Sequence, residues 1–322
     1  MAQAHMLLLL SNSIDGTADI LVELCRERGV AVFRFNIDLW TRYRFAWTAD
    51  GFRFDDPTGR SVASEDVTAV LWRRPSLRDT PEWEGGSPED RAATEAELQT
   101  IVREIGDWAR ARGLLRLIEP SGPRRVGRLA QMRVARDLFP TPEWAVGWGV
   151  RWPPGRRMVK RLTTESVGEG RDAYIFVQSV ETERLSPNWP WLIQEIAPAE
   201  RDATVLYVAG RCFGFEMERT RADLGVEDWR IRNGAHDDPW RPWSLPEGLA
   251  ATIDVYMKRL GLLFGRLDFL IDGATTTFLE VNPNGQFGWL DEPGAWPLHH
   301  AVLTAALDPA MAIDGSATTV ET

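Results

Sequence analysis

Hydrophobic residues near the start of the chain form an unbroken run, then a helical stripe, then a second short apolar stretch. The run at residues 6–10 (MLLLL) predicts a buried strand, and residues 31–36 predict another. Between them, apolar side chains recur at helical spacing over residues 17–28, and Gly29 ends that helix. A strand, a helix and a strand in this order indicate a parallel sheet covered by helices.

The first half of the chain closes with a long helix and a group of turn residues. Four elements follow the opening unit: a hairpin over residues 45–54 around Asp50-Gly51, a strand over 68–72, a helix over 88–112 that Ser87 caps, and a strand over 114–118. Residues 119–123 (EPSGP) are mostly turn formers, so we place a domain boundary there. The first predicted domain therefore spans residues 1–120.

The second half is predicted to be a mixed helix and sheet domain over residues 121–308. Its helices cover residues 126–138, 247–260 and 298–307, and its strands cover 144–147, 158–162, 174–180, 191–196, 204–209, 212–218, 265–271 and 276–282. Residues 309–322 are mostly small and polar, so we expect a flexible tail. The overall fold class is α/β.

Composition and charge narrow the class of protein. Of the 322 residues, 44% are hydrophobic and 26% are charged, which is typical of a chain that folds around a core. The net charge of −10 argues against nucleic acid or an anionic membrane as a partner, because such binding needs a basic surface. The run at residues 6–10 is far shorter than the roughly 20 residues of a membrane span. Only Cys25 and Cys212 are present, which fits a reducing cytoplasm.

The most informative segment is the strand pair at residues 265–282. Leu267, Phe269 and Ile271 share one face of the first strand, and Leu279 and Val281 share one face of the second. Burying both sets together, with an odd-numbered turn such as Gly273–Thr275, sets Asp268 opposite Glu280, with Asn282 on the same face. Two facing carboxylates repel unless a cation lies between them, and oxygen ligands of this kind hold Mg²⁺. The alternative is a strand edge whose carboxylates point into water.

Lys160 is the second candidate. Only Lys160 and Lys258 are lysines among the 37 basic residues, and Lys160 leaves its predicted strand on the face opposite Val159. It is either a phosphate-binding charge or a solvated strand lysine. The glycines of Gly168-Glu169-Gly170 follow, where backbone N–H groups can bind phosphate oxygens.

A third candidate is the end of the strand over residues 191–196. Gln194, Glu195 and Ile196 close an apolar strand, and the backbone there can read an adenine edge, with Asp202 nearby for a ribose hydroxyl. An ordinary surface strand explains the same pattern.

The order of these pieces resembles the ATP-grasp superfamily of carboxylate–amine and carboxylate–alcohol ligases. It is most similar to the microviridin-type graspetide ligases, which close rings in ribosomally made peptides through side-chain esters and amides. The resemblance extends to about residue 308, and the segments that suggest this branch are FLEVNPNGQFGW (278–289), Asp228-Trp229-Arg230, VLWRRP (70–75) and GRLAQMRVARDLF (127–139). It implies a parallel-sheet domain followed by a two-lobed ATP-grasp domain.

The resemblance also implies residue roles. The set comprises Asp268, Glu280 and Asn282 as magnesium ligands, Lys160, Arg128 and Arg230 as phosphate or acyl-phosphate contacts, Gln194, Glu195 and Ile196 as the adenine hinge, and Asp202 as the ribose contact. This chain departs from the family at two of its positions. Arg128 stands where a lysine is common, and Thr204 stands where the family has an arginine that contacts a phosphate or a substrate carboxylate.

The implied activity is an ATP-dependent ligase that phosphorylates Asp or Glu side chains of a precursor peptide and closes ester or amide rings with Ser, Thr or Lys. ATP and Mg²⁺ are the implied cofactors, and the peptide carries a leader segment. Two alternatives stay open: a ligase for a small molecule or a protein terminus, and a catalytically silent peptide- or nucleotide-binding relative. A homodimer also stays open.

Two arginines and four tryptophans are candidate contacts for the peptide. Arg73 and Arg74 end a predicted strand, where they either bind an acidic peptide segment or meet solvent. Four tryptophans lie in or near Pro-containing stretches and either line a peptide groove or fill the core: Trp189, Trp191, Trp240 and Trp243.

Overall fold

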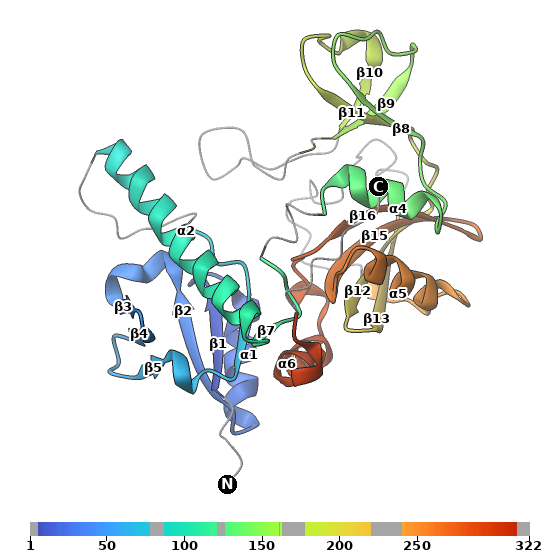
Figure 1. Cartoon of the computed structure of the whole chain (residues 1–322). Helices are drawn as coiled ribbons and strands as arrows, with labels where there is room; N and C mark the ends of the chain where they lie inside the picture. Colours follow the sequence, from blue (N-terminus) through green and yellow to red (C-terminus); the bar gives the residue numbers. More distant parts are fainter. Residues whose placement is uncertain are drawn as a thin grey trace.

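The structure is a computed structural model that describes residues 6–77, 87–120, 126–160, 162, 178–219 and 240–313. Figure 1 shows an N-terminal α/β region, a small four-stranded lobe and a larger sheet with helices beside it. The predicted α/β class is confirmed. Arg230 and the segment Gly168–Gly170 lie outside the described residues.

The N-terminal region is built on a parallel sheet in the order β2-β1-β6-β7. Its elements are β1 (Met6–Ser11), α1 (Gly16–Glu27), β2 (Ala31–Asn36), β6 (Ala69–Trp72), α2 (Pro88–Ala111) and β7 (Leu115–Arg116). Leu7 and Leu9 pack into the core under α1, while Leu8 and Leu10 pack into the core under α2. Helices cover both faces of this sheet, so every leucine of the run is buried and the run needs no polar positions.

A small antiparallel sheet extends this region. The strands β3 (Arg44–Thr48), β4 (Gly51–Asp55) and β5 (Ser61–Ala63) form it, and two short 3₁₀ turns, η1 (Ile37–Arg42) and η2 (Ser64–Asp66), flank it. The predicted hairpin is confirmed, with Thr48 paired to Gly51 across the turn. Phe52 and Phe54 alternate with exposed residues and fill the core beneath α2.

The second half contains a small lobe and a large sheet. The small lobe has the strand order β10-β9-β11-β8, from β8 (Trp144–Gly147), β9 (Arg156–Lys160), β10 (Gln178–Glu181) and β11 (Trp191–Gln194), with η3 (Thr182–Arg184). The large sheet has the order β14-β13-β12-β15-β16, from β12 (Arg201–Val208), β13 (Arg211–Glu218), β14 (Arg241–Pro242), β15 (Phe264–Asp272) and β16 (Thr275–Asn282). Figure 1 shows the small lobe standing apart from the large sheet.

The large sheet has two different faces. One face packs its apolar side chains, including Val205, Leu267 and Phe269, against α4 (Arg128–Arg136) and α5 (Leu249–Arg259). The opposite face is apolar at one end, where Leu206 and Phe264 enter a core shared with the N-terminal region. At its other end that same face carries polar residues. The polar end is where the candidate site lies.

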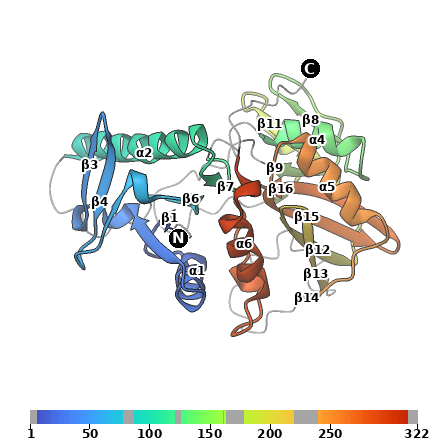
Figure 2. The same ribbon diagram turned by 60° about the horizontal axis from the view of Figure 1, so that its bottom comes forward.

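The last helix, α6 (Pro297–Leu307), joins the two halves of the chain. Leu298, Val302 and Leu303 belong to one core with α1 and β1 of the N-terminal region. Figure 2 shows α6 between the N-terminal region and the large sheet. A buried hydrogen-bond set precedes this helix, because Asp291 accepts the N–H groups of Leu298 and His299 at 3.0 and 2.9 Å and contacts the ring of His299.

The predicted tail needs a correction over its first residues. Pro309–Met311 form a 3₁₀ turn (η7), Ala312 pairs with Arg116, and the N–H of Ile313 donates to Leu115 O at 2.9 Å. The small residues of this segment therefore dock on β7 through backbone bonds, which composition does not reveal.

Replacing Leu303 with alanine tests the joint between the halves. Leu303 is fully buried, so we expect Leu303→Ala to lower the free energy of unfolding by about 2–5 kcal/mol, through lost burial and the cavity left behind. Chemical denaturation measures this. The exposed Val255→Ala on α5 is the control, and an equal effect of both changes would show that α6 does not hold the halves together.

The buried Asp291 gives a pH-dependent prediction. Burial acts to raise the pKa of this carboxyl, but hydrogen bonds from His299 and two backbone N–H groups outweigh burial and lower the pKa below its ordinary 3.8. The stabilisation is therefore fully present above pH 3.8 and is lost as the pH falls through the lower folded-state pKa.

We expect Asp291→Asn to destabilise the protein by about 1–3 kcal/mol at neutral pH. The difference from the parent protein shrinks below pH 3.8. Unfolding curves at several pH values measure it, with Asp50→Asn in the exposed hairpin turn as control. A difference that stays constant down to acid pH contradicts the assigned role.

Candidate active site

Three oxygen-bearing side chains converge on the polar end of the large sheet. Asp268 of β15 lies directly across from Glu280 of β16, as predicted, and Asn282 lies two residues further along β16. The amide Nδ2 of Asn282 donates to Asp268 Oδ2 at 3.2 Å and lies 3.5 Å from Glu280 Oε1. The three predicted metal ligands therefore form one cluster.

The pairing of Asp268 with Glu280 is as predicted, but a different turn and a bulge produce it. The turn holds two residues, Gly273 and Ala274, and a bulge between Asp268 and Phe269 shifts the pairing by one residue. Leu279 is the extra residue of this bulge. As a result Phe278, rather than Leu279, joins Val281 in the core, and Leu279 lines the cavity described below.

Asp268 is further held by Thr204 of the neighbouring strand β12. Thr204 pairs with Asp268, and its hydroxyl Oγ1 lies 2.8 Å from Asp268 Oδ1 and 3.1 Å from the carbonyl oxygen of Leu267. The family resemblance implies an arginine at this position. Thr204 instead contributes a short hydroxyl contact to a predicted metal ligand.

Two arginines contact the acidic cluster from different elements. Arg128, in the first turn of α4, forms an ion pair with Glu280, and Arg266 of β15 donates to Asp268 Oδ2 at 3.2 Å. Positive charge on both sides offsets the repulsion expected between two facing carboxylates. Sequence reasoning missed Arg266. Its position two residues before Asp268, and so on the same strand face, is the signal that could have found it.

A narrow cavity, too tight in this structure to admit a water molecule, lies beside this cluster, between the small lobe, α4 and β16. Lys160 and Gln194 share one face of the small lobe, since Lys160 pairs with Leu192, two residues before Gln194. They line the cavity together with Arg128 and Glu280. Four predicted site residues from four different elements therefore meet in one place.

The carboxylate and amide donor set fits a hard divalent cation such as Mg²⁺. Two carboxylates and an amide oxygen leave other coordination positions for water or phosphate. The described residues hold no group of three or more His, Cys, Asp or Glu side chains suited to a metal ion, so this mixed set is the candidate. Rotation of the Asn282 amide exchanges its oxygen and nitrogen positions and presents the oxygen to a cation.

Comparison with solved structures identifies the fold. A Chryseobacterium gregarium RiPP-associated ATP-grasp ligase, in complex with ADP and a leader and core peptide, matches with a TM-score of 0.80 at 19% identity, covering 96% of this chain and 98% of that chain. The macrocyclase MdnC from Microcystis aeruginosa MRC, bound with precursor peptide MdnA, matches with a TM-score of 0.74 at 21% identity over 92% and 98%. The chain has the ATP-grasp fold.

A third ATP-grasp structure adds a metal ion to the comparison. The ligase PsnB, complexed with minimal precursor, Mg and ADP, matches with a TM-score of 0.66 at 16% identity, covering 94% of this chain and 97% of that one. No protein-family model and no curated protein sequence matches the chain. The resemblance drawn from the sequence is confirmed for the ATP-grasp fold.

The predicted adenine hinge is only partly open. The N–H of Glu195 donates to the carbonyl oxygen of Glu143 at 2.8 Å, so this group is already engaged. Gln194 is buried, with Nε2 3.3 Å from the sulfur of Met132, whereas Ile196 is 44% exposed. The Glu195 N–H can therefore bind an adenine edge only if its hydrogen bond to the carbonyl oxygen of Glu143, the residue before β8, is broken.

Asp202, the predicted ribose contact, is engaged by Arg219. Both carboxylate oxygens accept from this guanidinium, at 2.9 Å each. Asp202 is two residues from Thr204 on the same face of β12, so it lies along the polar end of the sheet. Its contact with a ribose stays a prediction.

Arg73 does not fit the predicted contact with an acidic peptide. Only 1% of the residue is exposed; its Nε lies 3.3 Å from Asp15 Oδ2, and Nη1 donates to Asn284 Oδ1 at 3.1 Å. Burial lowers the pKa of Arg73 to about 10, with Asp15 opposing that shift and Arg74 adding to it. Arg73 thus ties the N-terminal sheet to the loop after Asn282. Arg74 is exposed, and its peptide contact stays a prediction.

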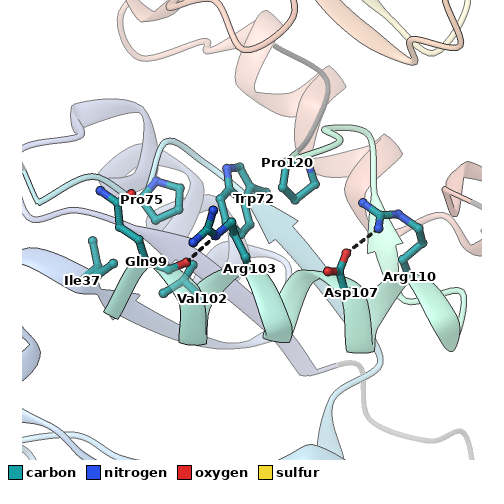
Figure 3. A pocket seen from close by; sticks show the side chains of 9 residues that line it. All are labelled: Ile37, Trp72, Pro75, Gln99, Val102, Arg103, Asp107, Arg110 and Pro120. Carbon is teal, nitrogen blue, oxygen red and sulfur yellow. Dashed lines mark hydrogen bonds and ion pairs between the residues drawn. The ribbon is translucent and has the colours of Figure 1, made fainter. Parts of the chain in front are cut away.

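A larger cavity, of about 220 Å³, lies away from these residues in the N-terminal region. Figure 3 shows its lining, in which Trp72, Pro75 and Pro120 face side chains of α2. Arg110 there is paired with Asp107 at 2.5 Å. No predicted nucleotide or metal residue lines it, so we assign the chemistry to the narrower cavity beside Asp268 and Glu280.

Helices in the described part of the chain lack the combination of length and apolar character that crossing a bilayer requires.

Thr204→Val tests the support of Asp268. The change removes the hydroxyl that contacts the carboxylate while keeping the side-chain shape, so we expect Mg²⁺ affinity in the presence of ADP to fall about threefold to tenfold. Calorimetry measures this. Thr252→Val on α5, where the hydroxyl bonds only the carbonyl of Gly248, is the matched control. Unchanged affinity in the Thr204 variant contradicts the role assigned to its hydroxyl.

Proposed function

We propose that the chain is an ATP-dependent ligase that acts on a ribosomally made precursor peptide with a leader segment. It activates Asp or Glu side chains as acyl-phosphates and closes ester rings with Ser or Thr, or amide rings with Lys. The observation that carries this proposal is the meeting of Lys160, Arg128 and Gln194 with Glu280 in one cavity, beside the Asp268 and Asn282 pair.

The residues suit phosphoryl transfer because they offer positioning and charge rather than a nucleophile. Lys160 and Arg128 bring positive charge to the cavity wall, and Asp268, Glu280 and Asn282 supply oxygen ligands for Mg²⁺. When bound, Mg²⁺ neutralises phosphate charge. The substrate carboxylate would otherwise approach a polyanion, which charge repulsion disfavours.

The reaction needs two displacements. A peptide carboxylate oxygen attacks the γ-phosphorus of ATP, the bond from that phosphorus to ADP breaks, and an acyl-phosphate forms. A Ser or Thr hydroxyl or a Lys amine then attacks the acyl carbon, phosphate leaves with the bonding electron pair, and the nucleophile loses its proton. Each ring therefore removes the elements of one water from the peptide and converts one ATP to ADP and phosphate.

Thr204 favours an enzyme over a silent binding protein. The absence of an arginine at this position is the sequence feature that favours a catalytically silent relative. Thr204 contacts a predicted metal ligand, and Arg266 brings a guanidinium to the same carboxylate from the next strand. Positive charge is therefore present at this end of the site.

The solved structures support the same class of substrate. The C. gregarium ligase holds ADP with a leader and core peptide, and MdnC holds a precursor peptide. With ATP as cosubstrate and a peptide made on the ribosome, we propose that the reaction takes place in the cytoplasm.

Asp268→Asn tests the proposal. Co-expression of the chain with a candidate precursor peptide, chosen from any short open reading frame found next to its gene, should yield a peptide lighter by one water per ring. The variant should reduce ring formation at least about a hundredfold, because metal affinity falls when a ligand carboxylate is lost. Intact mass and ADP release are the two measurements.

Asp272→Asn, at the end of the same strand, is the matched control and should cyclise the peptide normally. Normal ring formation by Asp268→Asn would overturn the proposal. A peptide whose mass rises by an added amine would favour the small-molecule ligase instead.

A further inference from the structure

The cavity of about 220 Å³ in the N-terminal region has no part in the proposed phosphoryl transfer. It lies between α2 and residues at or after the ends of β2, β6 and β7 (Figure 3). These strands belong to one parallel sheet, so their carboxyl ends meet at the same edge. In open parallel sheets with helices on both faces, ligands bind at that edge. The cavity therefore has the position of a binding site.

Apolar side chains line much of the cavity. They come from both of its sides and comprise Ile37, Trp72, Pro75, Val102 and Pro120. Gly106 brings α2 close to this wall, because a Cβ there would lie 3.2 Å from Pro120 Cγ and 3.4 Å from a ring carbon of Trp72. The helix thus rests against the indole and the proline, and the wall has its shape before a ligand binds.

The size of the cavity fits an aromatic side chain. An apolar cavity of about 150 Å³ is enough to bind benzene. The cavity here is larger, at about 220 Å³, so it has room for a phenyl ring and the first atoms of the chain that carries it. The indole of Trp72 adds a preference for a ring, because aromatic pairs attract beyond the area that they bury.

The polar rim of the cavity is positively charged, although the whole chain has a net charge of −10. Two arginines and one carboxylate line it: Arg103, Arg110 and Asp107. Arg110 is paired with Asp107 at 2.5 Å and with Glu119. Among the described residues, Arg103 donates only to a carbonyl and a hydroxyl of its own helix, at 3.2 and 2.9 Å. Its charge therefore favours a carboxylate beside the ring.

The cavity is also connected to the candidate active site. Trp72 on its wall precedes Arg73, and successive residues of a strand point to opposite faces. Arg73 binds Asn284, two residues after Asn282 of the acidic cluster. On the proposed function, on which this inference rests, a peptide must reach that cluster. One peptide can therefore contact both places.

We propose that this cavity binds an aromatic side chain of the precursor peptide that has an acidic residue next to it. The apolar wall takes the ring, and Arg103 takes the carboxylate. The contact holds the peptide on the N-terminal region while a different side chain of the same peptide reacts at the acidic cluster. The cavity is thus a substrate-binding site separate from the nucleotide and metal contacts.

A short peptide probe tests this proposal on the full chain. The probe is Nα-acetyl-L-glutamyl-L-phenylalanine amide. Its controls are the glutamyl-alanine analogue, which lacks the ring, and the glutaminyl-phenylalanine analogue, which lacks the charge. NMR of the indole N–H groups follows Trp72, whose resonance is assigned by its loss in Trp72→Phe. Trp47 of β3, which is 38% exposed, is the reference outside the cavity.

We expect the probe to shift the Trp72 resonance and to leave that of Trp47 unchanged. The alanine control should bind at least about tenfold more weakly, because burial of the ring is lost. The glutaminyl control should bind about twofold to fivefold more weakly, the effect of an exposed charge. An unchanged Trp72 resonance, or equal affinity for the probe and the alanine control, overturns the inference.

Two variants test the two parts of the cavity. Arg103→Gln should abolish the preference for the glutamyl probe, whereas Arg112→Gln should keep it, since Arg112 lies outside the cavity, 5.0 Å from the centre of the Trp108 ring. Val102→Phe takes up cavity space and should weaken probe binding at least about tenfold. A preference that survives in Arg103→Gln contradicts the proposal. If Val102→Phe does not fold, the Trp72 resonance and the Arg103 variant decide.

Competition distinguishes a peptide from a free aromatic acid as the occupant. A candidate precursor that the chain cyclises should displace the probe. If such a precursor leaves the probe bound, the peptide assignment is wrong and the cavity takes a small aromatic acid instead. If the chain binds no AMPPNP with Mg²⁺ and cyclises no candidate, the proposed function fails, and the peptide assignment fails with it even when the probe binds.

Discussion

Two carboxylates that face each other across adjacent strands are the constraint on which this structure depends. Asp268 and Glu280 repel, and a sheet tolerates such a pair only when positive charge or hydrogen-bond donors surround it. The surroundings supply both: two arginines, an amide and a hydroxyl contact the pair. The same arrangement suits a divalent cation, because its ligands are already brought together against their mutual repulsion.

The rest of the fold positions this acidic pair. One face of the large sheet is apolar where it meets the N-terminal region and polar where it meets the small lobe. The change from apolar to polar side chains along β12 and β15 therefore marks where the site begins. The N-terminal region also contacts the loop that follows the predicted metal ligands. Arg73 connects Asp15, at the start of α1, to Asn284 in that loop. A buried ion pair thus couples the position of the loop to the N-terminal sheet.

Local patterns predicted most elements and the main chemistry. Period-two alternation placed Asp268 and Glu280 opposite each other, and the leucine run at residues 7–10 predicted a buried strand. What sequence patterns missed depends on contacts between distant segments. A bulge and a two-residue turn give the same pairing as an odd-numbered turn, so the pattern alone does not distinguish them. The burial of Arg73 depends on Asn284, which is 211 residues away. The pattern does not distinguish Arg266 from an ordinary strand residue, because its contacts with Trp289 and with the carbonyl oxygen of Gln286 come from the segment after Asn282, which packs against it.

We propose that the Asp268, Glu280 and Asn282 cluster binds one divalent cation together with a nucleotide. Electron paramagnetic resonance of Mn²⁺, a spectroscopic substitute for Mg²⁺, measures this binding. We expect one Mn²⁺ bound per chain when AMPPNP is present, and loss of this signal in Glu280→Gln. If nucleotide-dependent Mn²⁺ binding is unchanged in Glu280→Gln, the cluster is not the cation site.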